Sequence, residues 1–271
     1  MSSSSTANTS DVNPPRVTLE KRGHLLLIGL NRPSKMNAFD LEMFSGLSEA
    51  YSQLEKDPEL RCGVLFAHGD HFTSGLDLMN VAPHIMQGHP ILPEGGIDPW
   101  GIYGPRVSKP LVSALHGKCL TLGIELALAT DIRIASENTT FAQIEIKRGI
   151  FPFGGATFRL MESVGWGNAM RYLLTGDSFS APEAYRMGMI QEVVPVGKHL
   201  ERAVEIATTI SQQSPLGVYA TLNSARTAVT KGPEEAGRQL LSEILRLMKS
   251  EDAQEGLMSF VEKRDAKFVG R

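Results

Sequence analysis

TLGIELALATDIRIA, residues 121–135, suits a buried core at almost every position, yet it carries the carboxylate of Glu125 in its middle. A buried ionised carboxylate is costly unless it is paired or hydrogen-bonded. The stretch follows a strand that ends near Leu115 and a glycine-bearing loop, so a helix is expected to begin within 121–123. A helix start offers unpaired N–H groups and a partial positive charge, which suit a developing oxyanion beside Glu125. A Glu125 that points to solvent or pairs with Arg133 explains the segment equally well.

Short strands and helices alternate along most of the chain on both sides of this stretch. Strands are expected at 17–20, 24–30, 63–69, 111–117, 132–136, 139–145 and 190–195, and the first two form a hairpin. Asp40 is expected to cap a helix whose apolar residues recur at helical spacing as far as Leu54, and further helices are expected within 155–174. The S-x-x-E spacing of Ser180 and Glu183 predicts a capping box.

After residue 196 the pattern becomes entirely helical. Helices are expected at 198–213, 215–230, 233–249 and 250–267. We therefore predict an α/β body at 16–196 and a helical region at 197–271, after a polar, serine-rich tail at 1–15 that is expected to be disordered. Residues 80–108 stand apart as a long loop rich in proline and glycine, a kind of segment that is often a functional lid.

Composition and charge exclude several classes of partner. The 271 residues carry 27 Lys and Arg against 30 Asp and Glu, a net charge of −3, which gives no basic footprint for nucleic acid or an anionic membrane. Cys62 and Cys119 are too few for a disulfide framework and lack metal-ligand spacing, so no metal site is expected. Without a signal peptide, a transit peptide or an apolar run long enough for a membrane span, a cytoplasmic protein is predicted.

Two further segments are candidates for the same site. HFTSGLDL, 71–78, follows a strand, and its glycine turn is able to point a backbone N–H toward a cleft, although ordinary turns look the same. FAQIEIKRGIFPFGGATFRL, 141–160, carries Glu145 just past a strand and a glycine turn before a helix. Taken alone, Glu145 fits a surface residue paired with Lys147 or Arg148. Two carboxylates and two donor turns together are what proton transfer next to a carbonyl requires.

The sequence resembles the crotonase family of enoyl-CoA hydratases and isomerases over essentially the whole chain after the tail. Seven segments match the family pattern in order: LNRPSKMNAFD (30–40), HFTSGLDL (71–78), SKPLVSALHG (108–117), GIELALATDIRIAS (123–136), FAQIEIKRGIFPFGGATFRL (141–160), LLTGDSFSAPEAYRMGMIQEVV (173–194) and FVEKRDAKF (260–268). The resemblance implies an α/β fold, a spiral of ββα units followed by a C-terminal helical trimerisation region, so a homotrimer or homohexamer is expected. It also implies an acyl-CoA substrate, with coenzyme A as part of the substrate and no separate cofactor.

The resemblance implies roles for four residues. The backbone N–H groups of Leu76 and Leu122 correspond to the oxyanion hole that holds the thioester oxygen. The family commonly has glycine at the position of Leu122; leucine keeps the main-chain donor but adds bulk beside it. Hydratases of the family use two glutamates, and both matching positions, Glu125 and Glu145, are acidic here. The implied reaction is hydration of a 2-enoyl-CoA, in which Glu125 orients a water and takes its proton while Glu145 protonates the α-carbon.

Contacts with the rest of the substrate follow from the same resemblance. A lysine that the family often places near the CoA phosphates is Met79 here. The expected CoA contacts are Lys35, Met36, Ala38, Ser74 and Asp77, with Phe260 and Lys263 offered by a neighbouring subunit. The segment 80–108 matches the variable region that shapes the acyl pocket, and the residues expected to line that pocket are Trp100, Ile102, Tyr103 and Phe153. Solvated lysines and ordinary aromatic packing are the alternatives.

Three functions are compatible with these residues. The pair of glutamates favours an enoyl-CoA hydratase, which is a hydro-lyase. An enoyl-CoA isomerase, or another enolate-forming acyl-CoA lyase or hydrolase, is the alternative, because members of the superfamily share the oxyanion hole and differ in side chains. A non-catalytic member that binds RNA or a partner protein is disfavoured by the absence of a basic stripe.

Overall fold

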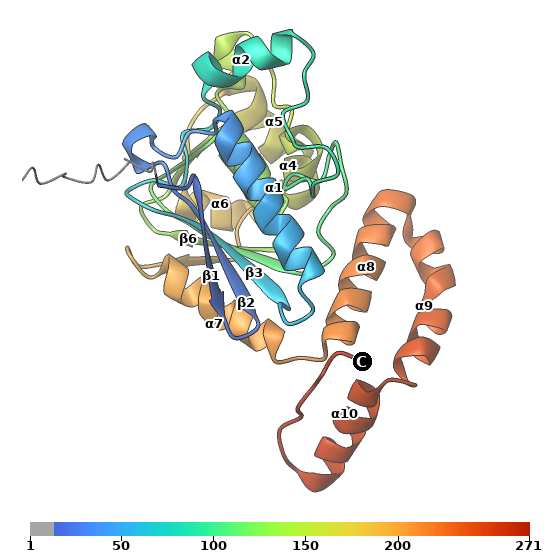
Figure 1. The fold of residues 1–271 in the computed structure, drawn as a ribbon. Helices are drawn as coiled ribbons and strands as arrows, with labels where there is room; N and C mark the ends of the chain where they lie inside the picture. The colour runs from blue at the N-terminus through green and yellow to red at the C-terminus, as the bar shows by residue number, and fades with distance from the viewer. Residues whose placement is uncertain (1–13) are drawn as a thin grey trace, which may run out of the picture.

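The body of the protein is built on a six-stranded sheet in the order β1-β2-β3-β4-β6-β9 (Figure 1). The structure, a computed structural model, describes residues 14–271, so the predicted tail lies outside the described residues apart from Pro14 and Pro15. β1 (Val17–Arg22) and β2 (Leu25–Leu30) form the expected antiparallel hairpin. The other strands continue the sheet in parallel: β3 (Cys62–Ala67), β4 (Leu111–Leu115), β6 (Ile132–Ser136) and β9 (Glu192–Val194).

A second sheet has three strands in the order β5-β7-β8. Its members are β5 (Lys118–Leu120), β7 (Thr140–Ala142) and β8 (Phe179–Ser180). The chain passes from β4 into β5 and from β6 into β7, so it turns twice from the large sheet into the small one and then into helical structure. This repeated passage is the predicted spiral of ββα units. β7 is shorter than the strand expected at 139–145, since the 3₁₀ helix η2 (Glu145–Arg148) begins at Glu145.

Helices α1 (Leu41–Lys56) and α7 (His199–Ser211) cover opposite faces of the large sheet (Figure 1). Side chains of a strand alternate between its two faces. Leu26 and Ile28 of β2 accordingly pack in the core that contains α1, whereas Leu25 and Leu27 pack in the smaller core under α7. Helix α3 (Leu122–Leu128) is buried along its whole length in the larger core, so the opening stretch lies at the centre of the body.

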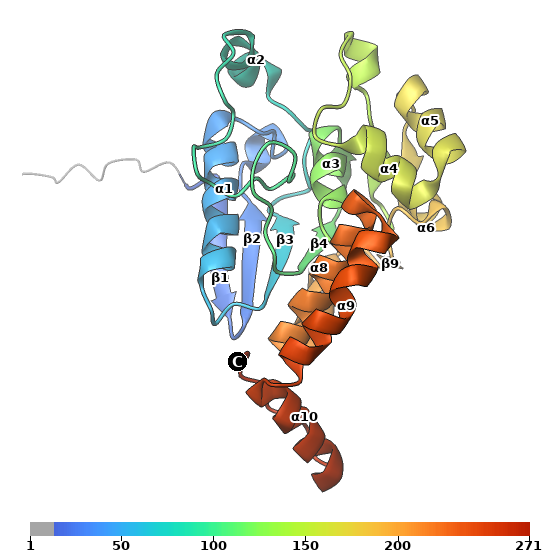
Figure 2. The same ribbon diagram turned by 90° about the vertical axis from the view of Figure 1, so that its right-hand side faces the viewer.

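The remaining helices connect the sheets or form the C-terminal region. They are η1 (Pro33–Lys35), α2 (Leu78–Met86), α4 (Ala156–Val164), α5 (Trp166–Thr175), α6 (Ala181–Met187), α8 (Pro215–Lys231), α9 (Pro233–Leu247) and α10 (Glu251–Glu262). Helices α8 and α9 pack on each other, and α10 projects beyond them, away from the end of the body that carries α2 (Figures 1 and 2). No helix within residues 14–271 has the length and apolar character needed to cross a bilayer.

The ends of α1, α2 and α10 show which predicted helix boundaries were right and which were wrong. Asp40 caps α1 as expected, because its side chain accepts a hydrogen bond from the N–H of Met43. The expected loop at 80–108 was wrong at its start: Asp77 caps α2, so residues 78–86 are helical. The helix expected at 250–267 ends at Glu262, where Lys263 adopts a left-handed φ of 54°.

The capping box at α6 is half formed. The hydroxyl of Ser180 accepts from the N–H of Glu183, as predicted. The carboxylate of Glu183 does not return the bond, since it binds Arg186 and Tyr172 instead. Gly188 ends the helix in a left-handed conformation with φ of 90°, which a glycine adopts without strain.

Two histidines stack where β4 meets the start of α7. The rings of His116 and His199 lie 4.5 Å apart, and the Nε2 atom of His116 is hydrogen-bonded to the carbonyl of Gly69. Burial, followed by the neighbouring His116, lowers the pKa of His199 to about 4. Burial also lowers the pKa of His116. Both rings are therefore neutral in the folded protein at pH 7.

This pair predicts a loss of stability in mild acid. In the unfolded chain His199 has a pKa of about 6.5. Between this pH and about 4 the unfolded chain therefore binds more protons than the folded chain. The free energy of unfolding therefore falls as pH drops through this window. The variant His199→Gln should lose less stability than the wild type between pH 7 and pH 5, as measured by thermal unfolding. Parallel pH profiles for the two proteins would contradict the assignment.

Candidate active site

Glu125 is fully buried in α3 and is held by backbone groups of another segment. Its Oε1 atom accepts hydrogen bonds from the N–H of Gly154, at 2.8 Å, and of Ala156, at 3.0 Å. Ala156 is the first residue of α4, so these donors belong to the start of that helix. Both simpler expectations for Glu125 were wrong: it does not point to solvent, and Arg133 donates instead to the carbonyls of Thr130 and Met189.

Gly154 is required beside this carboxylate by lack of space. A Cβ atom at this position would lie 2.8 Å from Glu125 Oε2 and 2.8 Å from Leu122 Cδ1, which is closer than real side chains approach. The backbone at Gly154 therefore packs directly against α3, which lies 29 residues earlier in the chain at Glu125. Glu125 Oε2 and Leu122 Cδ1 together fill the space beside Gly154.

Glu145 begins η2 and lies at the wall of a small hollow. Its residue surface is only 7% exposed, and Lys147 pairs with Asp177 rather than with it. The expectation of a surface ion pair was therefore wrong. The hollow has a volume of about 100 Å³ and is lined by residues of three separate segments: Ser74, Leu76, Leu78, Thr121, Leu122, Ile144, Glu145, Arg148, Ile150 and Phe153.

Burial raises the pKa of both carboxyl groups. The pKa of Glu125 rises to about 7, because desolvation outweighs the hydrogen bonds from Ala156 and Gly154 that favour the ionised form. The pKa of Glu145 also rises to about 7 through desolvation, with a further contribution from the charge of Glu125. Within residues 14–271 the Oε2 atom of each group has no hydrogen-bond partner. The site therefore holds two carboxyl groups that exchange protons near neutral pH.

Two backbone donors lie at the same hollow. Leu76 follows Gly75 in a segment that pairs with Phe39, and Leu122 is the first residue of α3. The hydrogen bonds of the described chain use the N–H of neither leucine. A Cβ atom on Gly75 would overlap the hydroxyl of Thr121, so the two turns are in direct contact. The N–H groups of Leu76 and Leu122 thus come from adjoining turns that line one hollow.

Thr121 holds a backbone conformation that is rare for its residue type. Its φ is 51°, a value that is a genuine outlier for a β-branched residue. Its N–H donates to the carbonyl of Ala142, and its carbonyl accepts from Ile124 and Glu125, so hydrogen bonds on both sides maintain the turn. Strain of this kind costs about 1–3 kcal/mol and is concentrated at functional sites.

Of the chain's residues expected to contact CoA, Ser74 lines the hollow, and the others lie in neighbouring segments. The N–H of Ser74 donates to the carbonyl of Met36, which joins the segment after η1 to the segment before Leu76. Lys35 is exposed, and Ala38 is largely buried. Asp77 is engaged structurally, since it pairs with Arg32 at 2.7 Å and caps α2.

The residues expected to line an acyl pocket divide into two groups. Tyr103 and Phe153 lie together, with the Tyr103 hydroxyl donating to the Phe153 carbonyl at 3.0 Å, and both line hollows. Trp100 is instead buried against Phe39, and it donates to the carbonyl of Leu122. Ile102 is half-buried against the core and lines neither of these two hollows.

Phe260 and Lys263 are not brought to this site within one chain. Both belong to the end of α10, which lies at the opposite end of the molecule from α2 and the hollow (Figure 2). The side chain of Phe260 is 82% exposed. Their contacts with the CoA of a neighbouring subunit stay a prediction.

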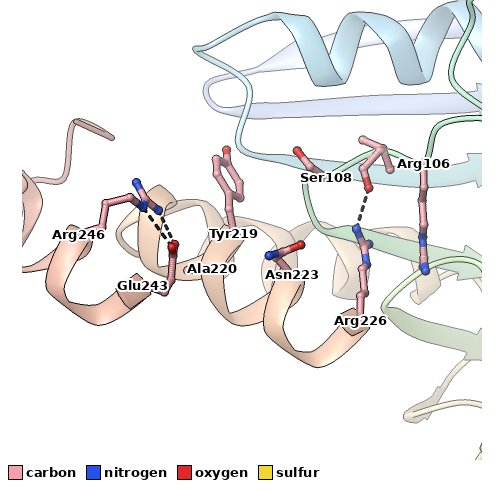
Figure 3. A pocket seen from close by; sticks show the side chains of 9 residues that line it. Arg106, Ser108, Tyr219, Ala220, Asn223, Arg226, Glu243 and Arg246 are labelled. Carbon is pink, nitrogen blue, oxygen red and sulfur yellow. Dashed lines mark hydrogen bonds and ion pairs between the residues drawn. The ribbon is translucent and has the colours of Figure 1, made fainter. Parts of the chain in front are cut away.

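A separate hollow of about 420 Å³ lies between α8, α9 and the segment 106–108 (Figure 3). Arg226 crosses it and donates to the carbonyl of Val107, and it also pairs with Asp131 at 3.1 Å. On the opposite wall Arg246 pairs with Glu243 (Figure 3). The Arg226 contacts join α8 to the body, whereas the Arg246–Glu243 pair lies within α9. The hollow contains neither of the buried glutamates.

Several residues of the site were missed from the sequence. The N–H groups of Gly154 and Ala156 hold Glu125, and Arg148 lines the hollow beside Glu145. The signal for the first two was the glycine pair directly before a helix, since a helix start is an anion-binding element. The Asp98-Pro-Trp-Gly turn was also missed, although an aspartate at such a position is a turn signal.

The spiral of ββα units around this hollow is the architecture of the crotonase superfamily. The model of the enoyl-CoA hydratase/isomerase family matches residues 20–271, and the chain belongs to this family. It is 35% identical over 268 residues to enoyl-CoA hydratase EchA19 of Mycobacterium tuberculosis, with coverage of 95% of this chain and 97% of the relative. It is 34% identical over 266 residues to (E)-benzylidenesuccinyl-CoA hydratase of Thauera aromatica, with coverage of 94% and 99%.

Solved structures give the same result. The crystal structure of a probable enoyl-CoA hydratase/isomerase from Mycobacterium abscessus superposes with a TM-score of 0.92 at 52% identity, covering 94% of this chain and 99% of that one. The relatives are named hydratases, and the family is one of acyl-CoA enzymes. The chain is therefore a member of the enoyl-CoA hydratase/isomerase family with the fold of its solved relatives.

The raised pKa of Glu145 predicts that this residue destabilises the folded chain in alkali. Its pKa rises from about 4.5 to about 7 on folding, so the folded chain binds more protons and loses stability as pH rises through this window. Between pH 5 and pH 8 the wild type should therefore lose up to about 2 kcal/mol of unfolding free energy that the neutral variant Glu145→Gln keeps. Thermal and urea unfolding at the two pH values measure this difference. The exposed Glu137→Gln is the control, and an equal response of both variants would contradict the assignment.

Proposed function

We propose that the protein is an enoyl-CoA hydratase that adds water across the 2,3 double bond of an acyl-CoA thioester. The observation that carries this proposal is a hollow lined by Glu145, Leu76 and Leu122, whose N–H groups are unused within the described chain. The buried Glu125 lies on the helix that begins at Leu122, and its charge acts on Glu145. The names of the relatives support it, because the two that are most relevant here are hydratases of CoA thioesters.

The N–H groups of Leu76 and Leu122 would hold the thioester oxygen. Negative charge develops on this oxygen when the β-carbon is attacked, and preorganised N–H donors stabilise such charge more strongly than the ground state. One donor of this kind is worth about 3–4 kcal/mol in other enzymes. The side chain of Leu122 narrows the hollow without removing its main-chain donor.

The two glutamates are distinguished by their surroundings. Two backbone N–H groups bind Glu125, and hydrogen bonds to the ionised form favour that form. The described side chains of the hollow give Glu145 Oε2 no such partner, and the charge of Glu125 favours the protonated form of Glu145. At neutral pH the first residue is thus the better base and the second the better acid.

These states fit the two proton transfers of hydration. Glu125 takes a proton from water while the water oxygen forms a bond to the β-carbon. Electrons of the double bond move toward the thioester oxygen, which the two N–H groups stabilise. Glu145 then delivers its proton to the α-carbon, so the product gains the elements of one water. The two glutamates end with exchanged protonation states, which solvent restores.

The substrate contacts and the assembly are part of the same proposal. Coenzyme A would contact Lys35, Met36, Ala38, Ser74 and Asp77. As part of the substrate, it would be the only cofactor that the reaction uses. The C-terminal region, 197–271, would build a homotrimer or homohexamer, because many large apolar side chains are exposed there. They include Leu240, Leu241, Ile244, Leu245, Met248, Leu257, Phe260 and Val261. In such an assembly Phe260 and Lys263 would meet the CoA of a neighbouring subunit.

A double-bond isomerase is the second candidate. The matching family model covers isomerases as well as hydratases, and both reactions use the same stabilised enolate. Incubation with a 3-enoyl-CoA in D₂O distinguishes them. A shifted double bond without any hydroxyacyl product would favour the isomerase.

Removing either carboxyl group should abolish most of the activity. General acid or base catalysis contributes about 10²–10⁴ in rate, so Glu145→Gln and Glu125→Gln should each lower kcat by a factor in this range. Loss of enoyl absorbance with crotonyl-CoA and longer 2-enoyl-CoAs measures the rate. Binding of a saturated acyl-CoA should stay nearly unchanged, since glutamine preserves the shape of the site.

Glu137→Gln serves as the matched control, because Glu137 is exposed and distant from the hollow. A loss of less than about tenfold in kcat for Glu145→Gln would show that this carboxyl group is not the acid. Absence of turnover by the wild type with every chain length, despite normal acyl-CoA binding, would reject the hydratase itself.

A single methyl group at Gly154 should disturb the base. In Gly154→Ala the new Cβ would collide with Glu125 Oε2 and Leu122 Cδ1, so the carboxyl group must move away from its hydrogen-bonded position. We expect kcat to fall about tenfold or more, because misplacement of a reacting group by about 1 Å costs up to 10² in rate. Gly237→Ala is the control, since its Cβ would meet no atom within 4 Å. Equal activity of the two variants would refute this placement of Glu125.

A further inference from the structure

Arg159 of α4 connects the turn that holds Glu125 to the turn at residues 98–103. Its Nη1 atom donates to the carbonyl of Gly154 at 3.4 Å, and its Nη2 atom donates to the carbonyl of Gly101 at 3.5 Å. Gly154 is also a residue whose N–H donates to Glu125 Oε1. One glycine therefore joins the carboxylate of Glu125 to the guanidinium group of Arg159 through its two backbone polar groups.

The guanidinium group lies in close contact with this turn. Gly155 has a φ of 106°, which favours glycine, and a Cβ atom there would lie 2.9 Å from Arg159 Nη1. The guanidinium carbon lies 5.3 Å from the centre of the Phe158 ring. Arg159 is half-buried, and a guanidinium group stays charged in such a setting. A permanent positive charge is therefore held against the turn that binds Glu125.

The charges near the two glutamates are of opposite sign. The charge of Arg159 favours the ionised form of Glu125. The charge that acts on Glu145 is the negative charge of Glu125, which disfavours its ionised form. Like charges repel each other mutually, so Glu145 is in turn the group that opposes ionisation of Glu125. The site thus has one cation, and it acts on one of the two carboxyl groups.

Other charged groups around Arg159 leave its charge available. The residues that act on it are Asp98, Glu162, Arg106 and Arg226. The carboxylate of Asp98 already accepts three backbone N–H groups of its own turn at 2.7–2.8 Å. Glu162 is exposed, where solvent and salt weaken its effect. Arg159 itself donates to backbone carbonyls, so its charge is available to act on a nearby carboxylate.

The deeper burial of Glu125 has to be offset if this residue is to be the base. Glu125 is 0% exposed and Glu145 is 7% exposed, and desolvation is the main cause that raises the pKa of each. Both pKa values nevertheless rise to the same value of about 7, because backbone N–H groups and Arg159 favour the ionised form of Glu125. Without the positive charge, Glu145 would ionise before Glu125.

We propose that Arg159 is a positioning residue that keeps Glu125 ionised, and that it thereby makes Glu125, rather than Glu145, the base. This inference rests on the proposed function and adds the residue that assigns the two proton transfers. Arg159 acts through the charge of its guanidinium group and through the turn at 154–155, not through a contact with the substrate.

The pH dependence of kcat/KM tests this role. A base must be ionised, so kcat/KM for crotonyl-CoA rises with pH through the pKa of Glu125. Arg159→Met removes the charge and keeps an apolar stem. The midpoint of the rise should therefore move to higher pH by about half a unit or more, which is about a threefold loss of kcat/KM on the acid side. Arg159→Gln also removes the charge but keeps a hydrogen-bond donor, and it should move the midpoint in the same direction.

Two further variants separate the charge from the fold. Arg159→Lys keeps the charge and loses the fork that spans two carbonyls, so its midpoint should stay close to that of the wild type. Arg171→Met is the matched control, because Arg171 is exposed, lies 5.2 Å from the centre of the Tyr172 ring and does not line the hollow. If the two neutral variants lower kcat/KM at every pH without moving the midpoint, or if Arg159→Lys moves it as far as Arg159→Met, the inference is wrong.

Unfolding measurements keep this test independent of turnover. The pKa of Glu125 is raised on folding, so the folded chain loses stability as pH rises from 5 to 8. In Arg159→Met the unfolding equilibrium constant should rise about threefold more over this range than in the wild type. The extra rise should vanish when Glu125→Gln is also present.

The two measurements distinguish failure of this inference from failure of the proposed function. If no enoyl-CoA is hydrated but unfolding shows the coupling of Arg159 to Glu125, the hydratase is wrong and the effect of Arg159 stands. If crotonyl-CoA is hydrated but neither the midpoint nor the unfolding responds to Arg159→Met, the inference is wrong and the hydratase stands. Absence of the coupling in unfolding overturns the inference whatever the activity.

Discussion

The Oε1 atom of Glu125 accepts hydrogen bonds from Gly154 and Ala156, which joins the buried helix α3 to the start of α4. A carboxylate removed from water loses several kcal/mol of solvation, and each hydrogen bond to a charged group returns about 1.5–3 kcal/mol. The hydrogen bonds do not fully compensate for the lost solvation, so the protonated form is favoured and the pKa of Glu125 rises to about 7. The same constraint keeps the group buried, oriented and able to exchange a proton at neutral pH.

The surrounding backbone is shaped by this carboxyl group and by the turn before it. Gly154 has no room for a side chain because Glu125 and Leu122 fill the space. Thr121 accepts an unusual φ, and Gly75 lies against its hydroxyl, so the turns that carry Leu76 and Leu122 are locked together. A protein that needed only a stable core would gain from an apolar residue at position 125. Retention of a carboxylate there, with a strained turn beside it, is the pattern expected where function opposes stability.

Much of the body was predictable because local signals and the buried pattern agree. The hairpin, the Asp40 cap and the sequence of strands and helices follow from periodicity and capping residues. The position of Glu125 on a helix start was also predictable, but its partners were not. Gly154 lies 29 residues further along the chain, and its contact with Glu125 depends on how the spiral closes. Charge pairing with Arg133 was the local guess, and tertiary hydrogen bonds overrode it.

The turn at residues 98–103 could not be predicted from the sequence in the same way. Trp100, Ile102 and Tyr103 lie close together in the sequence, and the family resemblance predicted the same role for all three. In the structure Asp98 fixes their turn so that Trp100 points into the core and Tyr103 reaches Phe153. This division depends on three hydrogen bonds to one buried carboxylate, which no periodic pattern encodes. The family resemblance identified the region, but the structure was needed to show that Trp100 packs in the core and that Tyr103 lines a hollow.

The most direct test follows the atoms of water into the product. Crotonyl-CoA is incubated with the protein in D₂O enriched in H₂¹⁸O-derived oxygen, and the CoA thioesters are analysed by mass spectrometry. We expect 3-hydroxybutyryl-CoA with one ¹⁸O on the β-carbon and one deuterium on the α-carbon, because Glu125 activates the water whose oxygen attacks the β-carbon and Glu145 delivers a deuteron that it has exchanged with solvent. Recovered crotonyl-CoA that carries neither label, or deuterium without oxygen, would contradict the assignment of this pair to hydration.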